Sequence, residues 1–99
     1  MFIIAGQFRV KPECRTALIA MAKGLLQPSR EESGCISYSF YEDQFAPNQF
    51  LFFERWRDRD SIDAHFEKSY LKDFAARFPD MIEGEAEINI YEIKDVEKV

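Results

Sequence analysis

Residues 49–57 constrain the fold most strongly, because this predicted strand is apolar on both of its alternate faces. Successive side chains of a strand point to opposite faces of a sheet, so three aromatic residues share one face while Leu51 and Phe53 share the other. An antiparallel sheet with one face in water carries polar residues on that face. The segment therefore predicts a sheet that is covered on both faces.

The rest of the chain supplies three further strands and two helical regions. Alternating apolar residues predict strands over Phe2–Val10, Cys35–Glu42 and residues 86–94. Apolar residues at spacings of three and four predict a helix from Cys14 to about residue 32, which Pro28 is expected to kink or interrupt. The second helical region begins at Ser61, a predicted N-cap, and continues with a short helix capped by Ser69.

The order β-α-β-β-α-β predicts an α+β domain of the ferredoxin-like type, with a four-stranded antiparallel sheet and both helices on one face. Two helices cover only one face of such a sheet, and a second copy of the sheet can cover the other across a two-fold axis. The sequence therefore predicts a homodimer; the alternative is that some aromatic side chains stay exposed. Residues 1–99 are expected to form one domain, with residues 95–99 as a loose, charged tail.

The composition argues against several partners and compartments. The formal net charge is −5, whereas nucleic-acid backbones and anionic membranes attract basic surfaces. The apolar run at residues 2–5 is too short for a signal peptide. Cys14 and Cys35 form neither a disulfide framework nor a zinc motif, so reduced thiols in a cytoplasmic protein are expected. One histidine and scattered carboxylates do not make a metal-ligand set, and no metal or cofactor is expected.

Several short motifs occur in a defined order along the chain. Val10-Lys11-Pro12-Glu13 follows the first strand, and Ser29-Arg30-x-Glu32-x-Gly34-Cys35-x-x-Tyr38 precedes the hairpin. Glu54-x-Trp56 lies on the third strand, with His65 nine residues after the tryptophan and then the region around Phe74. In this order and spacing, from Ile3 to about Ile93, the chain resembles the antibiotic biosynthesis monooxygenase family of dimeric α/β-barrel proteins.

The resemblance implies a dimer whose two sheets pack into a barrel, and it implies fold more firmly than function. Several members of that family oxidise phenolic or quinol-type aromatic compounds with molecular oxygen and without a metal, flavin or other cofactor. Some relatives degrade haem, and another isomerises a small signalling molecule. The haem-degrading branch has an Asn, a Trp and a His at positions that here hold Gln7, His65 and Phe74-Ala75, so haem degradation is not expected.

His65 is the only histidine and the candidate catalytic residue. Histidine is the side chain whose unperturbed pKa lies nearest neutrality. In an oxygenation without a cofactor, the substrate itself reduces oxygen, so the protein must bind an aromatic ring, exclude water and stabilise the substrate anion. His65 can accept the phenolic proton or donate to the anion; the alternative is a histidine that only hydrogen-bonds a neighbour.

Eight further residues are candidates for contact with the substrate. They are Tyr38, Phe40, Phe52, Glu54 and Trp56 on the strands, Phe66 and Phe74 in the helical region, and Arg30 as a group that can hold a carboxylate or phenolate. Phe66, Leu71, Phe74 and Phe78 can form a helical lid. Glu54 can orient His65, and Tyr38 can donate to a substrate oxygen. The alternatives are that the aromatic residues are ordinary core, that Glu54 is a structural carboxylate, and that Arg30 forms a salt bridge at a helix end.

The leading hypothesis is a cytoplasmic, cofactor-independent monooxygenase that oxidises a small aromatic, phenolic or quinol substrate with molecular oxygen. Its partners are then a second copy of the chain, the small aromatic molecule and dioxygen. Two alternatives stay open. One is a dimeric ligand-binding or stress-related protein without turnover, and the other is an isomerase or decarboxylase of a small carbonyl compound.

Overall fold

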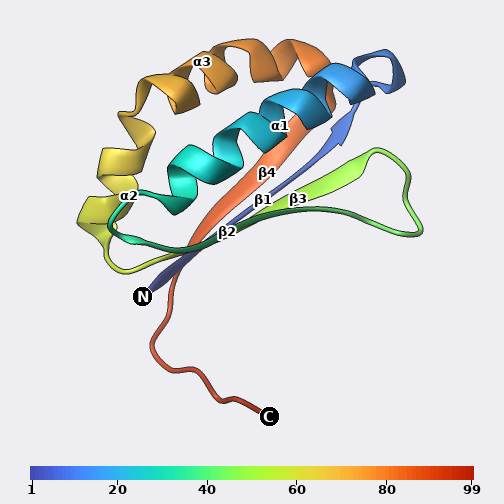
Figure 1. The fold of residues 1–99 in the computed structure, drawn as a ribbon. Helices are drawn as coiled ribbons and strands as arrows, with labels where there is room; N and C mark the ends of the chain where they lie inside the picture. The colour runs from blue at the N-terminus through green and yellow to red at the C-terminus, as the bar shows by residue number, and fades with distance from the viewer.

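The sheet has four antiparallel strands in the order β2-β3-β1-β4, as seen in the computed structural model of residues Met1–Val99 (Figure 1). The elements along the chain are β1 (Phe2–Val10), the 3-10 turn η1 (Pro12–Cys14), α1 (Arg15–Arg30), β2 (Cys35–Glu42), β3 (Gln49–Trp56), α2 (Arg59–Phe66), α3 (Ser69–Arg77), the 3-10 turn η2 (Phe78–Met81) and β4 (Ile82–Glu92). The predicted ferredoxin-like α+β fold is confirmed.

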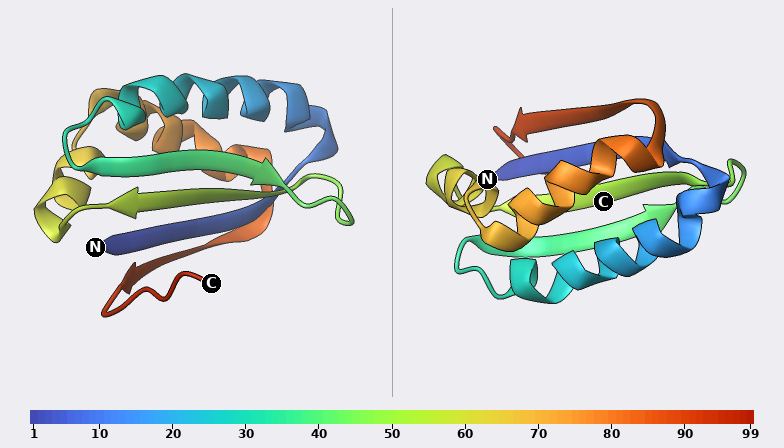
Figure 2. Two further views of the ribbon diagram at one scale, coloured as in Figure 1. Left: turned by 60° about the horizontal axis from the view of Figure 1, so that its bottom comes forward. Right: turned by 90° about the horizontal axis from the view of Figure 1, so that it is seen from above.

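The helices all lie on one face of the sheet, and they cover it unevenly. Figure 2 shows α1 running along the β2 edge, α3 crossing above the middle strands and α2 at one end. Strand β4 lies outside the area beneath the two longer helices. Ile88 of β4 faces the helices and yet keeps 59% of its side chain exposed, so this edge of the helical layer is open.

The core lies between the sheet and the helices, and it is built from one face of each central strand. The predicted alternation is confirmed, because even-numbered residues of β1 and β3 point to the helices. The buried set comprises Ile4, Phe8, Val10, Phe50, Phe52 and Trp56 from these strands, Tyr38 from β2, Leu18, Ala22 and Leu25 from α1, Ile62 from α2, Met81 from η2 and Ile82 from β4. Removing such apolar side chains from water is the main favourable contribution to folding.

The opposite face of the sheet has no helical cover. Ile3, Leu51 and Phe53 are half-buried there, and Tyr41 and Tyr91 are exposed. The doubly apolar pattern of β3 therefore corresponds to a core on one side and to an aromatic and aliphatic surface on the other.

The structure corrects the helix signals read from the sequence. Helix α1 does not stop at Pro28 but continues to Arg30; a proline near the end of a helix removes only one of its hydrogen bonds. The N-cap of α2 is Asp58 rather than Ser61, and its carboxylate accepts hydrogen bonds from the Ser61 amide at 2.8 Å and the Ser61 hydroxyl at 2.6 Å. Ser69 is the first residue of α3, and the preceding Lys68 is its N-cap.

The last strand also begins earlier than predicted, at Ile82 instead of residue 86. Gly84 lies inside β4 with a φ of +68°. Glycine adopts this left-handed conformation without steric cost, and the β1–β4 pairing shifts register nearby, between Gln7 and Arg9. None of the helices combines the length and apolar character of a membrane-spanning helix.

Candidate active site

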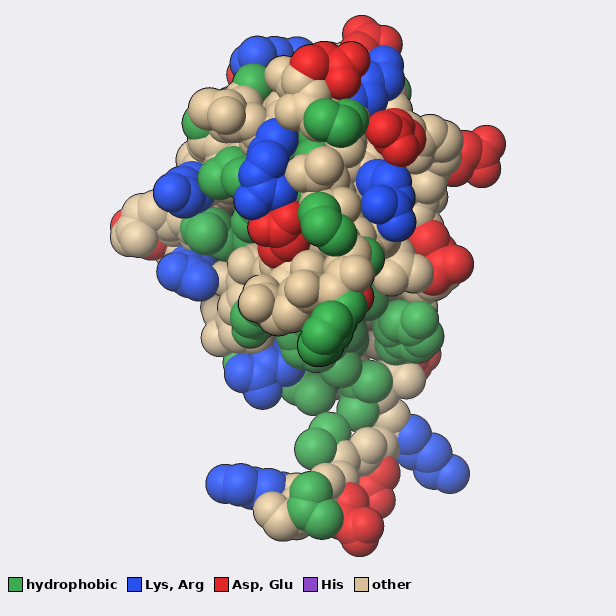
Figure 3. Space-filling model, turned by 90° about the vertical axis from the view of Figure 1, so that its right-hand side faces the viewer, with side chains coloured by type: hydrophobic (Ala, Val, Ile, Leu, Met, Phe, Trp, Pro, Cys, Tyr) green, Lys and Arg blue, Asp and Glu red, His purple; other side chains and the backbone are tan.

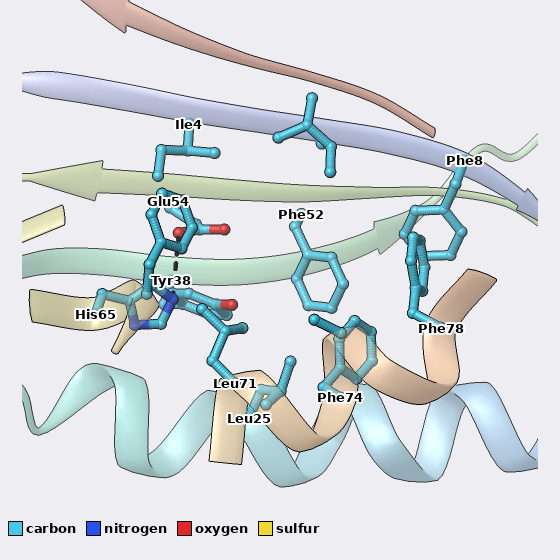
Figure 4. A pocket seen from close by; sticks show the side chains of 14 residues that line it. Ile4, Phe8, Leu25, Tyr38, Phe52, Glu54, His65, Leu71, Phe74 and Phe78 are labelled. Carbon is cyan, nitrogen blue, oxygen red and sulfur yellow. Dashed lines mark ion pairs between the residues drawn. The ribbon is translucent and has the colours of Figure 1, made fainter. Parts of the chain in front are cut away.

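An apolar cavity of about 180 Å³ lies between the sheet and helices α2 and α3 (Figure 4). Its only polar side chains are those of Tyr38, Glu54 and His65. A dry apolar cavity of about 150 Å³ is large enough to bind benzene. The cavity therefore has room for one substituted aromatic ring and a few groups that can orient it.

Six of the residues predicted from the sequence line this cavity together: Tyr38, Phe52, Glu54, His65, Phe66 and Phe74. Leu71 and Phe78, the remaining members of the predicted helical lid, line it as well. Further lining residues come from elements that the sequence reasoning did not connect with a site, namely Ile4, Gly6 and Phe8 of β1, Leu25 of α1 and Ile88 of β4. The strand order places β1 between β3 and β4, so residues of β1 and β4 share a face with Phe52 and Glu54.

Three residues predicted to contact substrate lie outside the cavity lining. Trp56 is fully buried, and its ring packs against the His65 ring with centroids 4.6 Å apart. Phe40 stacks on Phe50 at the other end of the core, with centroids 4.9 Å apart. The guanidinium Nε of Arg30 donates a 2.9 Å hydrogen bond to the Tyr38 backbone carbonyl, so Arg30 holds strand β2 and does not reach the cavity.

His65 is buried, with 1% of its side chain exposed, and its two ring nitrogens face different carboxyl groups. Nδ1 lies 2.7 Å from Oε2 of Glu32, and Nε2 lies 3.9 Å from Oε1 of Glu54, as the dashed line in Figure 4 marks. The Tyr70 hydroxyl donates a hydrogen bond to the same Glu32 oxygen. Glu32 and Tyr70 were not among the predicted site residues. The only sequence signal for Glu32 was its place in the Ser29–Cys35 motif.

Burial shapes the protonation of the groups in the cavity. It raises the pKa of Glu54 to about 7; the hydrogen bond from Trp56 opposes this rise, and the charge of Glu32 adds to it. Burial also lowers the pKa of His65, against the opposing effects of its hydrogen bond to Glu32 and of the Glu32 charge. The pKa of the Tyr38 phenol is raised, chiefly by burial. Near neutral pH the cavity therefore holds a neutral imidazole, a neutral phenol and a carboxyl group close to its own pKa.

The pair formed by His65 Nε2 and Glu54 Oε1 can bind one oxygen atom from two sides. Two atoms 3.9 Å apart can both reach a hydroxyl oxygen placed about 2.8 Å from each, which is an ordinary hydrogen-bond length. A protonated Glu54 can donate to that oxygen, and an unprotonated Nε2 can accept its proton. The arrangement can therefore hold a hydroxyl group and move a proton to or from it.

The cavity meets solvent on the side of β4. Phe66 and Ile88 both line it, and they keep 41% and 59% of their side chains exposed. This opening coincides with the strand that neither long helix covers. A small molecule can enter there without disturbing the core. No group of three or more His, Cys, Asp or Glu side chains in the structure is close enough to hold a metal ion.

Curated relatives resemble this chain over most of its length. An uncharacterised Synechocystis protein, sll1783, is 45% identical over 95 residues, which is 96% of this chain; the chain spans 65% of that protein's length. Rv0793 of Mycobacterium tuberculosis, named as a proposed monooxygenase, is 29% identical over 79 residues, which cover 80% of this chain and 77% of Rv0793.

The fold is also shared with solved structures. The structure of Rv0793 superposes with a TM-score of 0.91 at 25% identity, covering 98% of both chains. A conserved protein of Methanosarcina mazei superposes with a TM-score of 0.89 at 29% identity, covering 94% of this chain and 92% of its own. The family model for antibiotic biosynthesis monooxygenase matches residues 1–77. The chain therefore belongs to the antibiotic biosynthesis monooxygenase family.

Proposed function

We propose that this protein is a monooxygenase that oxidises a small, uncharged phenol or hydroquinone with dioxygen, without a bound cofactor. The observation that carries the proposal is the apolar cavity of about 180 Å³, whose polar groups His65, Glu54 and Tyr38 converge at one end. Family membership supports the class of chemistry. The fit between a ring-sized apolar cavity and a hydroxyl-binding pair supports the class of substrate.

The lining of the cavity favours a neutral ring over an anionic one. Phe52, Phe74 and Phe78 offer aromatic faces and edges to a bound ring. No Lys or Arg side chain lines the cavity, so a carboxylate on the substrate would lose its hydration without gaining a cation. The substrate hydroxyl is placed between His65 Nε2 and Glu54 Oε1, and the Tyr38 side chain forms part of the cavity wall beside them.

The proposed reaction converts a phenol with a free para position and one O2 into a para-quinone and one H2O. His65 Nε2 takes the hydroxyl proton, and the resulting phenolate gives electrons from its para carbon to dioxygen, forming a C–O bond to a peroxide. The peroxide takes a proton back, its O–O bond breaks, and the para C–H proton leaves with the departing hydroxide as water. Four electrons pass from the ring to dioxygen. A buried, water-poor site favours this sequence because it concentrates the reacting pair and protects the anion from bulk solvent.

Oxygen uptake with a panel of small phenols and hydroquinones tests the proposal. We expect one O2 consumed per quinone formed, and one atom of ¹⁸O2 in the product. His65→Ala should lower kcat by about 10²- to 10⁴-fold, the usual contribution of a general base. Lys23→Ala, a change on the exposed side of α1, serves as the matched control, and its kcat should equal that of the wild type. A carboxylated analogue of the best substrate should react more slowly.

Other outcomes would support the alternative functions. Thermal stabilisation by phenols with no oxygen uptake would contradict the oxygenase and favour a ligand-binding protein. A product formed without oxygen consumption would favour an isomerase or a decarboxylase.

We also propose that the working form is a homodimer joined through the uncovered face of the sheet. Figure 3 shows hydrophobic side chains gathered on the lower side of the molecule, near the point where the C-terminal tail leaves it. The half-buried Leu51 and Phe53 lie on that uncovered face, and an exposed cluster of apolar side chains of this kind marks an interaction site. Sedimentation should give twice the chain mass of 11.7 kDa. Phe53→Glu should yield monomers, whereas Phe45→Glu, in the exposed hairpin loop, should not.

A further inference from the structure

A buried polar network lies behind the candidate site, on the side of His65 that faces away from the cavity. Glu32 does not line the cavity; it lines a polar surface cleft together with Ser61 and Lys68. Its carboxylate is nevertheless largely buried, with 10% of the side chain exposed. A carboxylate in that position has lost most of its hydration and must be compensated by hydrogen bonds.

Those hydrogen bonds determine where the imidazole proton lies. The Tyr70 hydroxyl donates to Oε2 of Glu32, and His65 Nδ1 lies 2.7 Å from the same oxygen. An ionised carboxylate only accepts hydrogen bonds, and a neutral imidazole carries one proton on one of its two nitrogens. The contact with Glu32 therefore requires the proton on Nδ1. The lone pair of Nε2 is then left facing Glu54 and the cavity.

We propose that Glu32 is a positioning residue that holds His65 in the Nδ1–H form, so that Nε2 faces the substrate as a base, and that Tyr70 moderates this effect by sharing the same carboxylate oxygen. The inference deepens the proposed function, on which its catalytic consequence rests. A carboxylate that orients a histidine and stabilises its protonated form is a recurrent device in general-base catalysis. Here the carboxylate comes from the turn after α1, 33 residues before the histidine in the sequence.

The charged and titratable groups around His65 come from every element packed against it. They are Glu32 in the turn after α1, Tyr38 on β2, Glu54 on β3, Lys68 after α2 and Tyr70 on α3. The charges of Glu32, Glu54 and Arg30 also act on the Cys35 thiol of β2. Glu32 favours the protonated ring through its hydrogen bond and its charge, whereas Lys68 disfavours it. Of these groups, only Glu32 lies within hydrogen-bond distance of the His65 ring.

Nitrogen-15 NMR of the imidazole tests the inference directly, since the chain has a single histidine. The wild-type ring should be the Nδ1–H tautomer. Glu32→Ala removes the acceptor and should shift the ring toward the Nε2–H tautomer, which can donate to Glu54. Glu32→Gln keeps an acceptor oxygen but not the charge, so it should keep the tautomer and lower the pH midpoint of ring titration. Tyr70→Phe should keep the tautomer and raise that midpoint.

The kinetic consequence separates positioning from substrate binding. Because Glu32 does not touch the cavity, Glu32→Ala should lower kcat by at least tenfold and leave KM nearly unchanged, with Glu32→Gln in between. Two results would overturn the inference even if phenols are oxidised. One is an Nε2–H ring in the wild type, and the other is a tautomer and a kcat that Glu32→Ala leaves unchanged. If the variants shift the NMR signals as expected but no phenol is oxidised, the proposed function fails while the assignment of Glu32 stands. If Glu32→Ala does not fold, Glu32→Gln and Tyr70→Phe still test the inference, because they should move the pH midpoint of ring titration in opposite directions.

Discussion

The indole Nε1 of Trp56 donates a 2.9 Å hydrogen bond to Oε1 of Glu54, two residues earlier on the same strand. Both side chains point into the core, where Trp56 is fully buried and Glu54 keeps 6% of its surface exposed. The bond satisfies a buried N–H that would otherwise be costly to bury. It also fixes the carboxyl group against the cavity, with a pKa raised to about 7, chiefly by burial.

Stability should therefore depend on the charge of Glu54. A carboxyl group with a raised pKa binds its proton more tightly in the folded state, so it destabilises the fold as pH rises from about 4.5 to about 7. Glu54→Gln cannot titrate. The unfolding free energy of the wild type minus that of the variant should fall by up to about 3 kcal/mol across this window. Urea denaturation at pH 4.5, 5.5 and 7 measures the difference.

His65 contributes to the pH dependence with the opposite sign. Its lowered pKa means that stability is lost as pH falls below the ordinary histidine value, because the unfolded chain then binds the extra proton. Both proteins contain His65, so its contribution largely cancels in the comparison. A difference that stays flat or rises with pH would show that folding does not raise the pKa of Glu54.

A second carboxylate, Glu42, should make stability depend on pH with the opposite sign to Glu54. Arg15 on α1 makes two hydrogen bonds to Glu42 at the end of β2, of 2.5 and 2.7 Å, and the Asn48 amide donates to it at 2.9 Å. The Arg15 hydrogen bond and then the Asn48 amide lower the pKa of Glu42 to about 2. The stabilisation is thus complete above about pH 4.5 and is lost as pH falls toward 2.

Glu42→Gln should accordingly be less stable than the wild type at neutral pH and equal to it near pH 2. Acid titration followed by circular dichroism measures where the two curves converge. Glu13→Gln, an exposed change, controls for the loss of one negative charge. Curves that run parallel down to pH 2 would contradict a role for the Arg15–Glu42 pair.

Most of what the sequence could predict came from strand parity, the alternation of side chains between the two faces of the sheet. Alternation in β1 and β3 placed Glu54, Phe52 and Trp56 on one face, and that face does meet the helices. Alternation could not show that Trp56 lies behind Glu54 and His65 instead of beside the cavity. This depends on the depth of each side chain beneath α2, which is a property of tertiary packing. Arg30 was ambiguous for a similar reason, because its partner is a backbone carbonyl of Tyr38 and no charge pattern marks it.

The contact between Glu32 and His65 was beyond sequence reasoning. An acidic residue just after a helix normally lies in solvent, and apart from its place in the Ser29–Cys35 motif nothing local distinguishes Glu32 from Glu31. Its burial arises because the turn after α1 packs against α2, and His65 near the end of α2 and Tyr70 near the start of α3 both contact the Glu32 carboxylate. The early start of β4 was missed for a different reason, since Glu83, Gly84 and Glu85 interrupt any apolar alternation.

Gly34 should be required where this turn packs against α2. A Cβ at Gly34 would overlap the Cβ and Oγ of Ser61, and the backbone there cannot move freely because the Gly34 carbonyl accepts a 2.8 Å hydrogen bond from the Arg57 amide. Gly34→Ala should destabilise the protein by about 1–3 kcal/mol, as overpacking does. Ser61→Gly removes both overlapping atoms and should restore much of this loss in the double variant.

A double-mutant cycle measured by chemical denaturation gives the coupling between the two positions, which should be about 1 kcal/mol or more. Gly24→Ala is the matched control, because no atom lies within 4 Å of its added Cβ, and alanine should stabilise the helix there. Additive effects of Gly34→Ala and Ser61→Gly would contradict the packing seen here.

Gly6 offers a way to reduce the cavity without weakening the fold. It lines the cavity from β1, and a Cβ added there would meet only Ile88, at an ordinary contact distance of 3.5 Å. Alanine also restricts the unfolded chain, which should stabilise Gly6→Ala by about 0.5 kcal/mol. The same methyl group takes space from the ligand, so affinity for a ring-sized phenol should fall by about tenfold, or about 1.4 kcal/mol.

This opposition between stability and binding distinguishes a ligand cavity from a packing defect. Denaturation measures the gain in stability, and calorimetric titration with a series of phenols measures the loss of affinity. Larger substituents should lose more affinity than smaller ones, because the methyl group narrows the space beside Ile88. Gly24→Ala, which lies away from the cavity, should gain stability and bind as the wild type does. If Gly6→Ala bound every phenol as tightly as the wild type, the ring would have to lie elsewhere.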